Sequence, residues 1–339
     1  MFFFVVPVAL ARDAVVPRFA LLVASFLAAL ALPLAARAQT YESTVQPEML
    51  RIPFAPPVGQ RLDYEVDITR TGEGKSRTTR LYQALQFERI ESGYLLTIAT
   101  TRMVNENSAI DLSSGAGADR VPVDLRPLTM PVTLEVTVEG AISRVRDWPS
   151  LQRSIAGIPA AIAATVAPAK RATAVTLARR VLAPYASMTA EQAPDAVLKG
   201  WPSLLGLGGL ELISGRPYQS EVASQSPMIS VEIPVTQVVT LTVTSEGLFH
   251  LVQRSQPDEE KAGLAISQYL DRVGANLNAA QKANLARAGQ RFRAMKTRIS
   301  NDIDLDRQSG IVRRARMERW ISLPGMGEGT DVIAVSRIE

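Results

Sequence analysis

The sequence predicts an α+β protein whose strands form an antiparallel sheet. Its clearest alternation, at residues 61–70, puts four apolar side chains on one side and acidic side chains on the other, as in a strand with one solvated face. Strand-like and helix-like segments also form separate groups along the chain. This segregation favours an antiparallel sheet over a parallel sheet wound with alternating helices.

The first group of strands lies in the N-terminal half. Residues 39–60 contain four prolines and no periodicity, so they predict an extended Pro-rich arm. Strands are expected at 61–70, 78–90 and 94–103, with a loop at 105–119. A hairpin then runs from Val132, turns at Glu139-Gly140 and returns through Val145.

A helical block is expected from Ser150 to Gly208, where the period changes from two toward 3.6. Thr189 and Gln192 have the spacing of a capping box. The block is expected to break at its prolines, Pro159, Pro168, Pro184 and Pro202. The elements expected beyond it are strands at 217–254, helices at 258–293 and a final meander at 295–338.

The N-terminus has the features of a cleavable export signal. Arg12 and Arg18 precede the nearly continuous apolar segment 19–34, and small residues lead up to Ala38. Residues 1–38 are therefore expected to be a signal peptide, cleaved after Ala38. An uncleaved anchor is the alternative, but it needs ~20 apolar residues. The mature protein is expected to be periplasmic and not membrane-spanning.

Composition excludes several classes of function. The chain has no cysteine, which rules out disulfides, thiolate catalysis, cysteine-ligated zinc and a lipid-bearing cysteine. Residues 1–38 carry three arginines and one aspartate, so their removal lowers the net charge from +4 to about +2. This near-balance argues against a nucleic-acid partner, which demands a concentrated basic surface. No cofactor is expected either.

Two similar segments bear on the domain organisation. Residues 132–140 and 239–247 match at most positions, and a helical segment follows each hairpin. One interpretation is a duplication, which would divide the domain at 61–339 into halves at 61–212 and 213–339. The other is that two Val/Thr hairpins closed by Glu-Gly look alike by chance.

Two apparent binding motifs fail on their spacing. The glycines at 206–209 lack the third glycine of a dinucleotide loop, because Glu211 stands there, and no strand precedes them. Asp302, Asp304 and Asp306 alternate like the start of a calcium loop, but Arg313 stands where that loop needs a glutamate. The three aspartates are expected on a solvated strand face, and no metal site is predicted.

No catalytic residue is predicted. His250 is the only histidine in the sequence, and no G-x-S-x-G motif accompanies it, so it is expected to be a structural or surface side chain. Four arginines cluster near the C-terminus, and alternation puts Arg314 and Arg316 on one face and Arg313 and Arg319 on the other. A solvated face compensated by nearby carboxylates is favoured over a site for an anionic group.

The apolar segment 156–167 is too short to cross a bilayer and is expected to be core or the lid of a hydrophobic cavity. A ligand, if one binds, is expected between the sheet and this segment. The side chains that would line it are Ile155, Ile158, Ile162 and Val166. The three tryptophans, Trp148, Trp201 and Trp320, are expected in the core.

Two segments carry a resemblance to known proteins. They are Ile52-Pro53-Phe54-x-Pro56-Pro57-x-Gly59-x-x-Leu62-x-Tyr64 and Val138-Glu139-Gly140-x-Ile142-x-x-Val145-x-Asp147-Trp148. Together they resemble a group of exported bacterial proteins that carry a domain of unknown function. The layout is also similar to the open β-barrels of periplasmic lipoprotein carriers. That similarity implies a curved antiparallel sheet, an open or half barrel, packed against a helical block.

These observations favour a periplasmic protein without enzymatic activity. Its expected partners are a hydrophobic small molecule or lipid, or another protein of the cell envelope. A hydrolase of the envelope, with an active site assembled from residues far apart in sequence, is the first alternative. A structural or assembly factor of the envelope is the second.

Overall fold

The computed structural model describes residues 48–338 apart from a few internal segments. Those segments are 73, 107, 114–116, 122–124, 199, 227–228, 265–267, 269–295 and 324–326. The predicted signal peptide, the first part of the Pro-rich arm and most of the predicted helices at 258–293 lie outside the described residues.

Most of the described chain is antiparallel sheet. Its strands are β1 Met49–Arg51, β2 Arg61–Gly72, β3 Lys75–Ile90, β4 Gly93–Asn105, β5 Ser108–Asp111, β6 Val132–Val136, β7 Ile142–Val145, β8 Glu211–Ile213, β9 Tyr218–Ser226, β10 Ile229–Val243, β11 Phe249–Pro257, β12 Lys296–Leu305, β13 Val312–Leu323 and β14 Gly327–Ile338. The helices are η1 Ala118–Arg120, α2 Arg126–Thr129, α3 Trp148–Thr165, α4 Pro168–Ser187, α5 Ala193–Val197 and α6 Trp201–Leu205.

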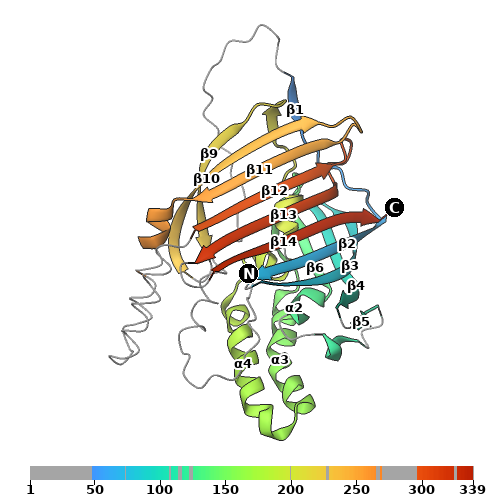
Figure 1. The fold of residues 1–339 in the computed structure, drawn as a ribbon. Coiled ribbons are helices and arrows are strands. Elements are labelled where there is room, and N and C mark those ends of the chain that lie inside the picture. The colour runs from blue at the N-terminus through green and yellow to red at the C-terminus, as the bar shows by residue number, and fades with distance from the viewer. Residues whose placement is uncertain are drawn as a thin grey trace.

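Twelve of these strands form one curved sheet that does not close on itself (Figure 1). The strand order is β7-β6-β4-β3-β2-β14-β13-β12-β11-β10-β9, with β5 paired to β4. β1 and β8 form a separate pair. The predicted antiparallel sheet is therefore confirmed, and β5 corrects the expectation of a plain loop at 105–119.

Alternation along the strands gives the sheet one buried face, which we call the inner face. In β2, Leu62, Tyr64 and Val66 are buried, whereas the residues between them are only partly buried. Their partners on β14 and β3 lie on the same face, because paired residues in an antiparallel ladder point the same way. The register therefore collects the apolar side chains of consecutive strands into one core.

The short helix α6 lies on the inner face and anchors it. The Trp201 indole Nε1 donates to Gln83 Oε1 on β3 over 2.8 Å, and its ring meets that of Tyr64 edge-on at 5.0 Å. Such an aromatic pair contributes about 0.5–1.5 kcal/mol beyond its buried area. Gly200, just before the helix, has φ 89°, and a Cβ there would come within 2.5 Å of Met317 on β13.

The described part of the Pro-rich arm, residues 48–60, crosses one end of the sheet. Ile52 exchanges backbone hydrogen bonds with Gly209 and Leu210, and the Ala55 amide donates to the Ser309 carbonyl in the β12–β13 turn. These backbone hydrogen bonds hold residues 52–55 of the arm against the segment 209–210 and the β12–β13 turn. Gly310 in the same turn lies so close that a Cβ would come within 1.8 Å of the Pro53 carbonyl oxygen.

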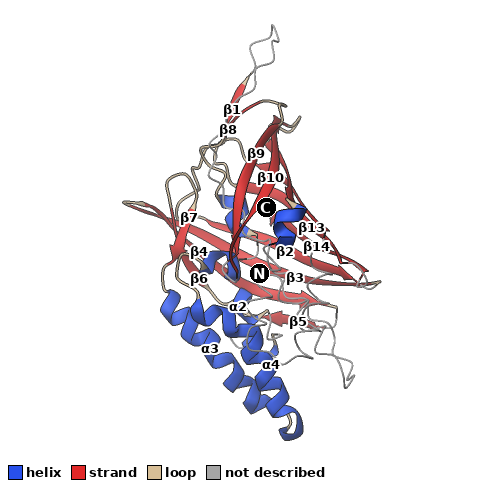
Figure 2. Ribbon diagram, turned by 90° about the vertical axis from the view of Figure 1, so that its left-hand side faces the viewer, coloured by secondary structure: helices blue, strands red, loops and turns tan. Residues whose placement is uncertain are grey.

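The helices α3 and α4 pack on each other and extend beyond the sheet as a hairpin, visible in both Figure 1 and Figure 2. Pro168 lies in the first turn of α4, where a proline costs no hydrogen bond. Pro159 and Pro184, however, lie inside α3 and α4, so the prediction that they break the helices is wrong. Each proline removes one backbone hydrogen bond, and the remaining bonds and the packing between two long helices outweigh that loss.

The predicted capping box is confirmed just before α5. Thr189 N donates to Gln192 Oε1 over 3.1 Å, and Gln192 N donates to Thr189 Oγ1 over 3.4 Å. These reciprocal bonds satisfy two amides that a helix start would otherwise leave unpaired.

The two similar hairpins close with the same turn. Thr137 N donates to Ala141 O, and Thr244 N donates to Leu248 O in the second hairpin. In both turns the glycine at the fourth position, Gly140 or Gly247, has positive φ. Both hairpins belong to the same continuous sheet, and the division into two duplicated halves stays a prediction.

Candidate functional site

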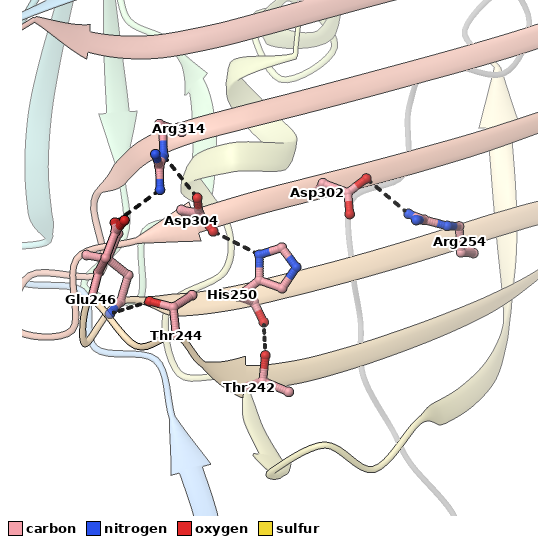
Figure 3. A network of polar contacts seen from close by, with 9 residues as sticks. Thr242, Thr244, Glu246, His250, Arg254, Asp302, Asp304 and Arg314 are labelled. Carbon is pink, nitrogen blue, oxygen red and sulfur yellow. Dashed lines mark hydrogen bonds and ion pairs between the residues drawn. The ribbon is translucent and has the colours of Figure 1, made fainter.

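His250 lies on the outer face of the sheet, within a network of charged side chains (Figure 3). Its Nδ1 is 2.8 Å from Asp304 Oδ1 on the neighbouring strand, and its side chain is 36% exposed. Asp304 also accepts a hydrogen bond from Arg314, which in turn reaches Glu246. The predicted surface position of His250 is therefore confirmed.

An Asp–His pair can serve as a base when a nucleophile and a substrate site adjoin it. The hydroxyl directly across the strand pair belongs to Thr242, but its Oγ1 donates to the backbone carbonyl of His250 (Figure 3). Arg254 and Asp302 form a further exposed ion pair nearby. This arrangement is that of an ion-pair ladder on a solvated face.

Alternation correctly put Arg314 and Arg316 on one face and Arg319 on the other, whereas Arg313 lies at a register shift between β12 and β13. Arg314 and Arg316 lie on the outer face and pair with Asp304 and Glu318. Arg313 pairs with Asp306 in the β12–β13 turn over 3.2 Å. The predicted compensation by neighbouring carboxylates is thus confirmed for these three arginines, and the predicted solvated strand face is confirmed for Asp302 and Asp304.

Trp320 departs from the prediction that all three tryptophans are core residues. Trp148 and Trp201 are buried, but Trp320 is only half-buried and lies on the outer face, under the guanidinium of Arg298 at 5.6 Å. Trp320 lies between Arg319 and Ile321, whose side chains point inward, so the alternation of the strand directs the Trp320 side chain outward.

The four residues predicted to line a ligand site belong to α3 and the residue after it. Ile155, Ile158 and Ile162 are buried, and Val166 is half-buried. They lie in the hairpin that α3 forms with α4, which extends beyond the sheet (Figure 2). A ligand site between these residues and the sheet stays a prediction.

A different set of residues, missed in the sequence, forms a polar stripe across the buried inner face. The strand register places one member on each of seven adjacent strands. We call this stripe the polar row: Ser220, Gln237, Ser255, Ile299, Arg319, Asp331 and Arg70. Six of its seven members are polar, although it lies on the face that forms the core.

Apolar residues flank the polar row along the strands. On one side the adjacent row contains Val239, Met317 and Ile333, and on the other side Val235 and Ile321 are buried. The row therefore has apolar side chains on both sides, although the row that contains Val239 and Met317 also includes Gln253 and Asn301. A second polar contact lies beside it, where Asn301 Nδ2 donates to Gln253 Oε1 over 3.2 Å.

Arg319 and Asp331 form a buried ion pair within the row. Their side chains are 6% and 3% exposed, and Arg319 Nη2 donates to Asp331 Oδ2. Burial lowers the pKa of the Arg319 guanidinium, while the charge and the hydrogen bond of Asp331 act in the opposite direction. The pair thus introduces two opposite charges into the core with no net charge of its own.

Gln237 has the most unusual environment in the row. It is fully buried, and within the described chain neither its Nε2 nor its Oε1 has a hydrogen-bond partner. Thr297 Oγ1 and Asp331 Oδ1 are likewise buried and unpartnered there. Most buried polar atoms in proteins are paired, and each unpaired one costs about 1–3 kcal/mol, so these atoms are an energetically costly feature of the inner face.

The sequence did hold a signal for the polar row. Arg319 is in phase with Met317 and Ile321, and Asp331 is in phase with Ile333 and Val335, so each charge falls on the apolar side of its strand. A charged residue in phase with apolar neighbours on a strand points to a buried, paired charge.

Neither a cluster of metal ligands nor a membrane-spanning helix is found among the described residues. Among them, no group of three or more histidine, aspartate or glutamate side chains is arranged to hold a metal ion. None of the described helices is long and apolar enough to cross a membrane.

Comparison with protein-family models and with curated proteins finds no match to this chain. The resemblance to exported proteins with a domain of unknown function stays a prediction.

Proposed function

We propose that this protein acts outside the cytoplasm as a non-enzymatic binding protein for an amphiphilic molecule. The polar group of that molecule would bind at the polar row, and its apolar part would lie on the adjoining apolar surface of the inner face. In this proposal the curved sheet is an open half barrel, and the helical block covers it. The export signal predicted at residues 1–38 supports a site of action in the periplasm.

The observation that carries this proposal is the fully buried, unpartnered amide of Gln237. An amide can both donate and accept, as can the hydroxyl of Thr297, whereas Asp331 Oδ1 only accepts. A head group that offers both donors and acceptors, such as a hydroxyl or an amide, would satisfy both polar atoms of the Gln237 side chain.

The apolar surroundings of the row support an amphiphile over a small polar solute. Val235 and Val239 flank Gln237 on β10, and Met317 and Ile321 flank Arg319 on β13, so the polar row has buried apolar side chains on both sides. Burial of an alkyl chain contributes about 0.8 kcal/mol per methylene, so even a short chain would add substantially to the affinity.

The test is mass spectrometry of an organic extract from the mature protein, purified without detergent from the envelope of its own cells. We expect about one amphiphilic molecule per chain. Gln237→Leu should reduce this content about tenfold or more, because the bound head group would lose both hydrogen bonds of the amide.

Gln256→Leu is the matched control, since Gln256 is exposed at the end of the neighbouring strand β11. It should carry as much of the molecule as the native protein. The ligand-free Gln237→Leu variant should also be at least as stable as the ligand-free native protein, since an unpaired amide is replaced by an apolar side chain. An empty extract from folded native protein, or equal contents in the native protein and Gln237→Leu, would refute the proposal.

A further inference from the structure

The α3–α4 hairpin differs in charge from the rest of the molecule. Over the whole chain, 37 basic residues face 33 acidic ones. Between Trp148 and Ala190, in contrast, the sequence has no aspartate or glutamate and five basic residues: Arg153, Lys170, Arg171, Arg179 and Arg180. The hairpin is therefore a local positive region on a nearly neutral protein.

The tip of the hairpin is uncharged and built from small residues. No charged residue occurs from Ser154 to Ala169. The isoleucines of this stretch, including Ile158 and Ile162, are buried, and Val166 is half-buried. Ala164 is exposed, as are residues 167–169 at the turn. The tip thus presents a small apolar surface, with Lys170 and Arg171 immediately behind it.

The hairpin holds this tip away from the sheet. At 1.5 Å per residue, the 18 residues of α3 span about 27 Å, and both views show the two helices extending together beyond the strands (Figure 1, Figure 2). Its base is fixed, because the buried Trp148 indole donates to the Met188 carbonyl over 2.8 Å. The tip can therefore reach a flat surface before the sheet does.

The basic side chains on this hairpin are available for an external partner. Arg153, Lys170, Arg171 and Arg179 are exposed. Across the described part of the chain, no ion pair joins any of these four to an acidic side chain, whereas arginines on the outer face of the sheet, such as Arg80 and Arg314, pair with carboxylates.

We propose that the α3–α4 hairpin docks on the surface of an anionic lipid bilayer. The uncharged tip would enter the head-group region, and Lys170 and Arg171 would contact lipid phosphates. An apolar tip followed at once by basic residues matches the order of layers that a bilayer presents, with acyl chains below a negatively charged surface. This proposal goes beyond ligand binding and does not depend on it.

Vesicle sedimentation tests the electrostatic part. We expect the mature protein to bind vesicles that contain phosphatidylglycerol far more strongly than vesicles of phosphatidylcholine alone, and less strongly as salt screens the charges. Each basic residue near such a surface contributes about fivefold in affinity, so Lys170→Gln with Arg171→Gln should weaken binding about 25-fold. Lys75→Gln with Arg77→Gln is the matched control, because it removes the same charge from exposed positions on β3.

A fluorescent label tests the placement of the tip. Since the chain has no cysteine, Ala164→Cys gives a single attachment point for an environment-sensitive dye, and Ser76→Cys on β3 gives an exposed control. With phosphatidylglycerol vesicles, the dye at position 164 should shift to shorter wavelength and be quenched by nitroxide-labelled lipids, while the dye at position 76 should not change.

Three results would overturn the proposal: no binding to phosphatidylglycerol vesicles, equal weakening by both double variants, or no change at position 164 on vesicle binding. Capture of an acidic protein by the hairpin, in the absence of vesicle binding, would show instead that the positive region serves a protein partner. Each of these results leaves the amphiphile content of the extract unaffected, so the two proposals fail separately.

Discussion

The buried ion pair between Arg319 and Asp331 gives a quantitative test of the inner face. Both residues are about 95% buried, so removal of one partner leaves the other charge in the core without its counterion. Breaking such a pair typically costs about 3–5 kcal/mol. We therefore expect Arg319→Met and Asp331→Leu each to lower the free energy of unfolding by about that amount.

The double variant, Arg319→Met with Asp331→Leu, has a different expected outcome. It removes both charges and fills their space with apolar side chains, which in comparable buried pairs is neutral or stabilising. We expect the double variant to lie within about 1 kcal/mol of the native protein, which is about 5 kcal/mol or more below the sum of the two single costs.

Urea unfolding of ligand-free protein at pH 7, followed by tryptophan fluorescence, measures the free energy of unfolding of the native protein, the two single variants and the double variant. Arg316→Met is the control, because Arg316 on the same strand pairs with Glu318 while 58% exposed, and its loss should cost less than about 0.5 kcal/mol. If Arg319→Met costs as little as the control, or if the double variant costs the sum of the single variants, the reasoning on a desolvated pair is wrong.

Two further predictions concern the turns. At Gly310, φ is 70° and a Cβ would collide with the Pro53 carbonyl, so Gly310→Ala should destabilise the protein by about 3 kcal/mol or more in thermal unfolding. Gly247 has φ 75° but open space around it, so Gly247→Ala should cost only about 1–2 kcal/mol. Similar costs at both sites would refute the contact with the arm. Burial alone would raise the pKa of Asp306, but hydrogen bonds from Ser309 outweigh it and hold that pKa below its usual value. The ionised Asp306 carboxylate therefore stabilises the fold at neutral pH, and this contribution is lost as the pH falls below about 4. Asp306→Ala should therefore cost about 1–2 kcal/mol at pH 7 and progressively less in urea melts toward pH 3; a gap that stays constant with pH would contradict this.

Much of the fold could be predicted because a strand with one buried face shows its orientation in sequence. The alternation of Leu62, Tyr64 and Val66 predicted both β2 and its inward side chains, and the same pattern located the later strands. Strand order could not be predicted, since periodicity shows which face is buried but not which strand is the neighbour. The pairing of β14 with β2 joins residues as distant as Asp63 and Ile338.

The candidate site could not be predicted from the sequence for the same reason. Alternation correctly put Arg319 on the opposite face from Arg314 and Arg316, but its partner Asp331 becomes apparent only when β13 is paired with β14. The burial of Gln237 was still harder to predict, because a glutamine among valines and threonines is also typical of a half-exposed strand.

The central position of β14 sets the order in which the molecule can be completed. This strand is the last that the structure describes, yet it lies between β2 and β13, in the middle of the sheet. Until residues 327–338 are present, the strands on either side form two separate sheets, each with an open edge of unpaired backbone groups. Most pairings along the sheet are local hairpins, whereas the pairing of β2 with β14 joins residues as distant as Asp63 and Ile338 and therefore has a larger cost of loop closure. A chain that lacked residues 327–338 would therefore lose the central strand and expose two long edges with unpaired backbone groups, so deletion of β14 should lead directly to aggregation.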